Sequence, residues 1–591
     1  MGSGGGSRPG RPLGVLCVLA FAAVGCVPLP ARLPAQTPRP LGVTAPASPA
    51  GNAAPLALAS FGVTLVPGRQ EATLTWRYAP DSAPARVLHL DLYSVVRGVS
   101  YRSASTIIGQ TVEPHTYTIP LPAGSWSVRA TPENAWGFGP GSTGTVTVTN
   151  PCRAADLCAR VSTSAAPVPV RLAAQGFLLG VTDGAGQLLN PTKVAQLAPR
   201  QWRFSGATSN AAAAGLGVSR MQILSDLWNS ATAPGHSGYA QTPWSDWNAW
   251  QTFVQGTVRL AEQQGWAPNY WDVWNEPNGT CCPRFSPADQ ATVTVGRWMQ
   301  TYALAWQAIK SVDPNAQVVG PSLSALQWAP GAPAEFDLDT FLSYSAAHNV
   351  RWDAVSWHEN TSAPSPGDVF SSISNVDRHV AMAKAVMARH PGTVAKNRIL
   401  INEYGPSDTH MLAGWAVGFF RAFEDDGVSQ ANLACWSEAE CTTQLDGLLT
   451  PAGATTAVWW AHRLYADLGG ATRMAVASSA PWQLDGLATR NDRSRTVRAL
   501  LGRHWSCNQR ANAWCANNTY IGGASVAVTI DWPYGSAPVH LVASRLAAGT
   551  GAVVTPPVLR SVVVIPKAGT LTLTVPGVSD GDAISIVARR A

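Results

Sequence analysis

From Phe177 onward, the hydrophobic and polar positions of the chain follow two alternating patterns. Short runs of β-branched and aromatic residues favour extended strands. Each is followed by a longer stretch in which apolar residues recur every three or four positions, as in an amphipathic helix. The strand-like runs occupy residues 177–181, 200–206, 218–228, 270–276, 317–324, 352–359, 398–405 and 428–436. Eight such units in about 290 residues predict a (β/α)8 TIM barrel. An open doubly wound sheet is the alternative, but no glycine-rich phosphate loop follows the first strand.

Two stretches between these strands show helical spacing most clearly. Residues 245–265 place five apolar residues on one face, with Pro243 near the predicted start and Gly265 as the predicted end. The five are Trp247, Trp250, Val254, Val258 and Ala261. The next helix is predicted to open at Pro287, because apolar residues recur at the same spacing beyond it.

Strict alternation of apolar and polar residues predicts β-structure on both sides of the barrel. Short alternating runs between residues 57 and 150 indicate a small β-sandwich. Trp76 and the segment SWSVRATPENAWGFGPGS resemble a fibronectin type III module. We therefore expect a multidomain chain, with the following order. It comprises a signal peptide (1–35), a Pro/Ala-rich linker (36–54), a fibronectin III- or Ig-like β-sandwich (55–150), the barrel (170–470) and a C-terminal β-sandwich (471–591).

The N-terminal residues predict export from the cell. Arg8 and Arg11 precede LGVLCVLAFAAVG, an apolar stretch too short to span a bilayer as an ordinary helix. Cleavage after Ala35 would release a secreted protein, whereas AVGC resembles a lipoprotein box and makes a lipid anchor at Cys26 the alternative. The later cysteines form close pairs, which predict local disulfides in an oxidising compartment. The pairs are Cys152/Cys158, Cys281/Cys282, Cys435/Cys441 and Cys507/Cys515, and Cys281 and Cys282 form either a vicinal bond or bonds to two separate partners.

Composition narrows the range of partners. The formal charge of +6 is spread over 591 residues without a Lys/Arg run, so no nucleic-acid partner is expected. No further stretch is long and apolar enough to predict a transmembrane span. The 24 tryptophans suit a core, and they also suit stacking against the flat faces of sugar rings. No cofactor or metal is expected, because the acidic residues lack calcium-loop spacing and the cysteines lack zinc-site spacing.

The predicted barrel brings two glutamates together. Active sites of such barrels form at the C-terminal ends of the strands. Glu276 ends the fourth predicted strand in the segment YWDVWNEPN, and Glu403 ends the seventh in RILINEYG. Both carboxylates should therefore lie at one mouth. Glycoside hydrolysis requires such a pair.

These residues resemble the family-39 glycoside hydrolases, which are retaining enzymes of clan A. The segment YWDVWNEPN carries the resemblance most strongly, supported by VDPNAQVVGPSLS, SWH and LDGLLTPAGATTAVWWAHRLY. The sequence departs from the family at strand seven, where Asn-Glu-Tyr replaces the more usual Thr-Glu-Trp or Thr-Glu-Phe. The resemblance implies that Glu276 is the acid/base, Glu403 is the nucleophile, and Asn275 binds the sugar 2-hydroxyl.

Further side chains are candidates for the same site. Arg203 is expected beside the nucleophile, with Arg220 as its rival. His358 and Tyr404 are expected to orient the nucleophile or bind hydroxyls, and Trp436 to lie under the sugar ring. Structural roles are the alternatives: a satisfied histidine, a core tryptophan, or an arginine paired with a structural acid. No role is assigned to Glu359, Asp226 and Asp408, although all three are near strand ends.

The leading interpretation is a secreted retaining glycosidase with a carbohydrate substrate. Family 39 implies β-xylosides first, with arabinose-containing glycans and exopolysaccharides also open. A transglycosylase on the same scaffold and a non-catalytic carbohydrate-binding or adhesive protein are the alternatives. Three matches to the glycosylation sequon are interpreted as accidental, because two fall at the proposed mouth, and the protein is expected to be bacterial.

Overall fold

The structure is a computed structural model, and it describes most of the chain beyond residue 52. The described residues are 53–80, 82, 85, 87–96, 99–109, 115–121, 123–134, 137–152, 155–163, 168–183, 186–233, 238–278, 285–326, 336–360, 372–405, 411–434, 445, 447–504, 523–549 and 551–591. The chain divides into two compact units, Met1–Pro49 and Ala50–Ala591, and the described residues belong to the second. The predicted signal peptide, and the predicted linker up to residue 52, lie outside them.

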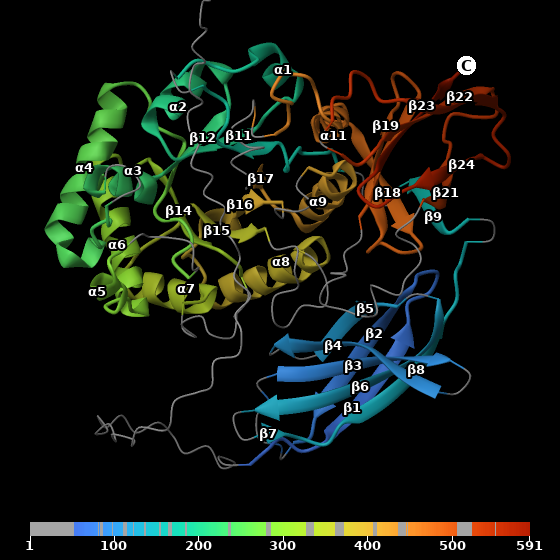
Figure 1. Cartoon of the computed structure of the whole chain (residues 1–591), viewed down its shortest axis with the longest axis horizontal. Helices are drawn as coiled ribbons and strands as arrows, with labels where there is room; N and C mark the ends of the chain where they lie inside the picture. Colours follow the sequence, from blue (N-terminus) through green and yellow to red (C-terminus); the bar gives the residue numbers. More distant parts are fainter. Residues whose placement is uncertain are drawn as a thin grey trace, which may run out of the picture. The chain divides into compact units, whose positions relative to one another are not determined.

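Eight parallel strands close into a barrel, which confirms the predicted fold class (Figure 1). The strands are β10 (Gly176–Leu178), β11 (Gln201–Phe204), β12 (Ser219–Ile223), β13 (Tyr270–Asp272), β14 (Gln317–Leu323), β15 (Ala354–Glu359), β16 (Ile399–Tyr404) and β17 (Gln430–Leu433). Each pairs with the next in chain order, and β10 closes the ring against β17. Their residues are almost all buried, because side chains fill the inside and helices cover the outside.

Helices follow the strands and surround them, as Figure 1 shows. They are α1 (Pro191–Gln196), α2 (Ala207–Ala212), α3 (Leu224–Thr232), α4 (Trp247–Gln263), α5 (Pro287–Gln290), α6 (Val295–Val312), α7 (Leu338–Ala347), α8 (Ser372–Arg389), α9 (Ala413–Asp426) and α11 (Ala457–Ala466). The predicted apolar face of α4 is buried except for Trp247, which is half-buried.

One helix start and the length of another helix differ from the predictions, while the predicted start at Pro287 is confirmed. Helix α4 begins at Trp247, because the Asp246 carboxylate caps it by accepting from two backbone N–H groups, and Pro243 lies in a separate 3-10 turn. The helix predicted from Pro287 is two helices, α5 and α6. Thr294 caps the second through a hydrogen bond from the backbone N–H of Arg297 at 3.3 Å.

The C-terminal strands form one hydrogen-bonded sheet of nine strands in the order β23-β22-β25-β20-β19-β18-β9-β21-β24. Their bounds are β9 (Leu157–Thr163), β18 (Thr472–Ser478), β19 (Leu484–Asn491), β20 (Thr496–Arg503), β21 (Ala524–Asp531), β22 (Val539–Leu546), β23 (Val558–Val564), β24 (Thr570–Val578) and β25 (Ala583–Arg590). Strand β9 precedes the barrel in sequence, yet it lies between β18 and β21. The chain therefore leaves this sheet, builds the barrel and returns.

Helix α9 packs directly against this sheet. The backbone N–H of Gly414 donates to the carbonyl oxygen of Gly581 at 2.7 Å. A Cβ atom on Gly414 would lie 2.2 Å from the carbonyl oxygen of Arg503, so only glycine permits this approach. The contact fixes the outer face of the barrel at β16 against the C-terminal sheet.

The N-terminal strands form two antiparallel sheets, in agreement with the predicted two-sheet sandwich. One contains β1 (Leu58–Leu65), β2 (Glu71–Tyr78) and β5 (His115–Pro120). The other contains β4 (Val99–Gly109), β3 (Val87–Val96), β6 (Gly124–Asn134), β7 (Gly137–Phe138) and β8 (Ser142–Val148). Trp76 from the first sheet and Trp126 from the second are buried in one core. The fibronectin type III assignment stays a prediction.

A disulfide joins Cys152 to Cys158, with 5.7 Å between their Cα atoms. The other three predicted cysteine pairs lie outside the described residues. Within the part of the chain that the structure describes, no helix is long and apolar enough to cross a membrane.

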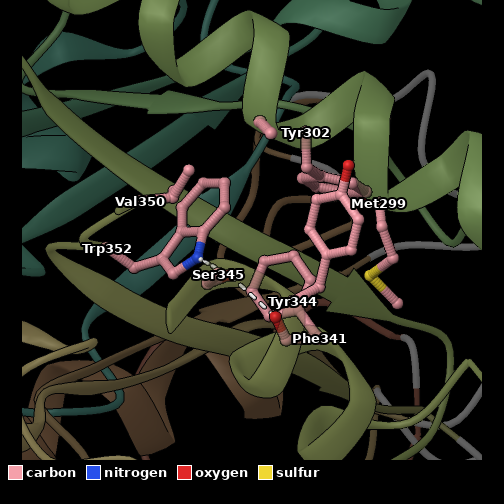
Figure 2. Close-up of a pocket in the computed structure, with 8 residues that line it drawn as sticks. Met299, Tyr302, Phe341, Tyr344, Ser345, Val350 and Trp352 are labelled. Carbon is pink, nitrogen blue, oxygen red and sulfur yellow. Dashed lines mark hydrogen bonds between the residues drawn. The ribbon is translucent and has the colours of Figure 1, made fainter. Parts of the chain in front are cut away.

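Aromatic side chains pack on the outer side of the barrel, next to β14. Tyr302, Tyr344 and Trp352 line a small apolar pocket between α6, α7 and the start of β15 (Figure 2). The indole Nε1 of Trp352 donates to Ser345 Oγ at 2.8 Å. The Tyr302 hydroxyl donates to the carbonyl oxygen of Pro321 at 2.6 Å, so this packing supports the end of β14. None of the residues lining the pocket is charged, and its role is packing.

Candidate active site

Three strands deliver two carboxyl groups and an imidazole to one place at the barrel mouth. Glu276 follows β13, His358 is on β15 and Glu403 is on β16, and all three are buried. His358 Nδ1 lies 2.7 Å from Glu276 Oε1 and 3.4 Å from Glu403 Oε2. One carboxylate oxygen of Glu276 lies within 4.8 Å of one carboxylate oxygen of Glu403. The two glutamates predicted to converge therefore do so.

The backbone at Glu276 is held in an unusual conformation. Its φ of 50° is in the left-handed region, which costs a non-glycine residue on the order of 1–3 kcal/mol. Its N–H donates to the carbonyl oxygen of Ser322 at 3.0 Å, which ties it to β14. Pro277 then prevents the chain from continuing as a strand. Such strain is typical of a side chain aimed into a site rather than of an ordinary turn.

A β-bulge presents Glu403. In the pairing of β15 with β16, Trp357 lies opposite Ile401 but His358 lies opposite Glu403, so Asn402 is an extra residue. Neighbouring residues of a regular strand point to opposite faces. Here both Asn402 and Glu403 make their polar contacts inside the barrel, because the bulge turns one of them.

Arg203 on β11 holds the nucleophile candidate, as predicted. Its Nη1 donates to Glu403 Oε1 at 2.5 Å, and its Nε and Nη2 donate to Asp272 Oδ2 at 2.9 and 2.7 Å. Nη2 also donates to the Asn275 side-chain oxygen at 2.8 Å. Burial by itself lowers the pKa of Arg203, but the carboxylates of Asp272 and Glu403 outweigh it and raise that pKa above the ordinary value. The guanidinium is a permanent positive charge in the site.

The rival arginine lies elsewhere. Arg220 is near the start of β12, at the opposite end of the barrel. Its guanidinium donates to the Asn210 side chain and to the carbonyl oxygens of Trp266 and Ala267. Arg220 therefore packs strands and loops together, and it has no part in the site.

Sequence reasoning missed the acid beneath the site. Asp272 is completely buried and accepts from Arg203, Asn402 and the Ser322 hydroxyl, the last two at 2.9 and 2.7 Å. Asn402 also donates to Ser322 Oγ at 2.7 Å. A signal was present: an aspartate within a strand that is otherwise aromatic and branched has to be paired inside the barrel.

The prediction that Tyr404 contributes to the site is wrong. Tyr404 is buried on the outer side of β16, against Phe419 and Phe423 of α9, and its hydroxyl donates to the carbonyl oxygen of Ala174 at 3.2 Å. Residues that follow each other in a strand alternate in direction, so the residue after an inward Glu403 points outward. Burial raises the pKa of Tyr404 well above its ordinary value.

The structure describes some of the other residues that are near strand ends in the sequence. Asn275 lies beside Arg203 and is half-buried. Glu359 accepts from Trp357 and from His379 of α8, so its role is to connect β15 with that helix. Trp436 and Asp408 lie outside the described residues.

The group formed by Glu276, His358 and Glu403 has the donor atoms of a metal site, two oxygens and a nitrogen, all within 4.8 Å of one another. The same three groups also suit acid–base and nucleophilic chemistry without a metal. Carboxyls at this spacing, one beside a fixed cation and one beside an imidazole, can transfer a proton and form a covalent bond to the same substrate.

Comparisons with known proteins agree with this geometry. Residues 241–411 match the family model of "Glycosyl hydrolases family 39". A 3-O-β-L-arabinopyranosyl-α-L-arabinofuranosidase of Bifidobacterium pseudocatenulatum is 24% identical over 270 residues, which are 44% of this chain and 25% of that protein. A β-xylosidase of Geobacillus stearothermophilus is 30% identical over 128 residues, which are 20% of this chain and 22% of that protein.

The match to these two relatives is therefore partial, spanning about a quarter of their length. Among solved structures, N2152 from Neocallimastix frontalis superimposes with a TM-score of 0.56 and 17% identity, covering 74% of this chain and all of that one. This similarity shows the fold. The segment that matches the family model contains Glu276, His358 and Glu403, so the barrel of this chain resembles the glycosyl hydrolases of family 39 where the site lies.

Proposed function

We propose that this chain is a retaining glycosidase that cleaves O-glycosidic bonds by double displacement. The separation of the two carboxyl groups carries the proposal. Retaining enzymes place them about 5–5.5 Å apart and inverting enzymes about 6.5–9.5 Å apart. The distance of less than 4.8 Å between an oxygen of Glu276 and an oxygen of Glu403 supports retention.

In the first step, Glu276 gives its proton to the glycosidic oxygen while a Glu403 oxygen attacks the anomeric carbon. The bond to the leaving group breaks, and a glycosyl ester forms on Glu403. Arg203 donates to Glu403 Oε1, so the attacking oxygen is Oε2, which lies 3.4 Å from His358 Nδ1. Glu276 is 4% exposed, and one of its oxygens lies within 4.8 Å of an oxygen of Glu403.

In the second step, Glu276 has lost its proton and Glu403 is a neutral ester. Glu276 then accepts a proton from water while the water oxygen attacks the anomeric carbon, which releases the sugar and restores both carboxyl groups. His358 Nδ1 lies 2.7 Å from Glu276 and 3.4 Å from Glu403, and its place between them supports a positioning role. Asn275, fixed by Arg203, is our candidate for binding the sugar 2-hydroxyl.

We also propose that the substrate is a poly- or oligosaccharide containing xylose or arabinose, because both partial relatives act on pentosides according to their names. The N-terminal sequence supports export by a signal peptide, with the lipid anchor at Cys26 as the alternative.

The test is hydrolysis of aryl xylosides, arabinosides, glucosides and galactosides and of a polysaccharide panel, with the anomeric product followed by NMR. Glu403→Gln and Glu276→Gln should each abolish turnover. Glu359→Gln is the matched control, because Glu359 is also buried at a strand end but faces α8. Release of the inverted anomer, or full activity in Glu403→Gln, would refute the proposal.

A further inference from the structure

A third carboxylate enters the mouth of the barrel from the first turn of α3. Asp226 is the third residue of α3, which directly follows β12, and it is half-buried. Its neighbour Ser225 also touches the site, since Ser225 Oγ accepts from the backbone N–H of Asn275 at 3.3 Å. Asp226 is near enough to Arg203 and Glu403 for their charges to act on it.

The contacts of Asp226 leave it with unused acceptor capacity. Ser225 donates to Asp226 Oδ1 at 3.2 Å, and the Ser205 hydroxyl at the end of β11 also donates to it. An ionised carboxylate has about four acceptor positions, so two hydroxyl donors do not saturate it. Among the described residues, no cationic side chain forms an ion pair with Asp226. Burial, opposed by these hydrogen bonds and by Arg203, raises its pKa above the ordinary value.

A structural explanation accounts for only part of this. An acidic residue in the first turn of a helix interacts favourably with the helix dipole. That role would be served equally well by a side chain pointing into solvent. It does not explain why Asp226 accepts hydrogen bonds from two serine hydroxyls and interacts electrostatically with Glu403 and Arg203. A half-buried acceptor that feels the charges of Glu403 and Arg203 instead suits a sugar hydroxyl, which is a neutral donor.

We infer that Asp226 is a glycone-recognition residue, which accepts a hydrogen bond from a sugar hydroxyl other than the 2-hydroxyl and thereby selects neutral sugars over uronic acids. This inference rests on the proposed glycosidase function. Selection against uronic acids follows from charge. A sugar carboxylate at this position would meet Asp226 and Glu403, while the guanidinium of Arg203 is already engaged by Asp272, Glu403 and Asn275.

The experiment compares wild type, Asp226→Asn, Asp226→Ala and the control Asp353→Asn. Asp353 is also half-buried but caps β14 at the opposite end of the barrel, where it accepts from the backbone N–H of Val318 at 2.9 Å. Substrates are 4-nitrophenyl xyloside, arabinoside, glucoside and glucuronide, followed by the 3-deoxy and 4-deoxy forms of the best substrate. Circular dichroism and denaturant unfolding establish that each variant is folded.

We expect both Asp226 variants to lose about ten- to a hundred-fold in kcat/KM on the best substrate, mainly through KM, while Asp353→Asn changes little. On one of the two deoxy substrates, wild type and the Asp226 variants should have equal kcat/KM, because the hydroxyl that Asp226 binds is missing there. A merely structural role for Asp226 cannot produce this result. The ratio of kcat/KM for the neutral glycoside to kcat/KM for the glucuronide should be smaller in Asp226→Asn than in wild type. Equal losses on all substrates, or unchanged kcat/KM, would overturn the inference. If wild type hydrolyses none of the glycosides, the proposed function itself fails.

Discussion

We expect the hydrogen bonds of Arg203 to contribute both to the stability of the barrel and to catalysis. Its guanidinium donates to two buried carboxylates at once, those of Asp272 and Glu403, with exposures of 0% and 5%. Removing one partner of a buried ion pair costs about 3–5 kcal/mol, because the other charge is left uncompensated. We therefore expect Arg203→Met to lose at least that much of a total stability of about 5–15 kcal/mol, and to approach the limit of folding.

Arg203→Lys is the more informative change. The lysine keeps the positive charge, but a single ammonium group cannot reproduce the fork that reaches Asp272, Asn275 and Glu403 together. We expect a loss of about 1–3 kcal/mol in the free energy of unfolding. Because Glu403 loses its fixed donor on Oε1, kcat/KM should fall about 10²- to 10³-fold.

The assay is denaturant unfolding together with steady-state kinetics on the best aryl glycoside. Arg220→Lys is the matched control, a half-buried arginine at the other end of the barrel that should leave kcat/KM unchanged. A double-mutant cycle on unfolding, combining Arg203→Lys with Glu403→Gln, should show coupling above 0.5 kcal/mol or so, since the residues touch. An Arg203→Lys enzyme with wild-type stability and wild-type kcat/KM would refute the reasoning.

Four further outcomes are expected. Tyr404→Phe should change kcat/KM less than about two-fold and cost about 1 kcal/mol of stability, measured by unfolding, because its hydroxyl serves only a carbonyl oxygen away from the site. Asp272→Asn should lower kcat/KM at least about ten-fold, since the cluster that orients Arg203 loses its charge; unchanged kinetics would contradict this. Burial lowers the pKa of His462 from 6.5 to about 3, so the unfolded chain binds its proton first. The free energy of unfolding should therefore fall as pH drops from 6.5 toward 3, by on the order of 4 kcal/mol for this residue, and His462→Asn should flatten that decline in unfolding titrations. Gly414→Ala should destabilise the contact between α9 and the C-terminal sheet by about 2 kcal/mol or more, visible as a lower Tm, without altering KM.

The order of the elements and the two glutamates that converge at the mouth are already apparent in the sequence. Strand propensity and helical spacing are local properties, so eight repeating units and the barrel they form can be read from residues 177–436. Closure of the barrel then follows from topology, and it places every strand end at one mouth. Glu276 and Glu403 could be paired on this ground alone, and Arg203 was identified because a nucleophile of this kind needs a positive charge.

Tertiary structure decided which way the side chains point and what compensates their charges. Tyr404 was misjudged because a one-residue bulge at Asn402 sets the direction of everything after it, and a bulge depends on pairing with β15 rather than on local sequence. Asp272 was missed because its role exists only where β11, β14 and β16 converge on it. Strand β9 lies in a sheet whose other strands come some 300 residues or more after it in the chain. The hydrogen bonds that join them are long-range, so no local sequence pattern predicts them. The sequence by itself thus determined the scaffold and the pair of glutamates at its mouth, while long-range contacts alone decided the register, the buried charge network and the surroundings of Asp226.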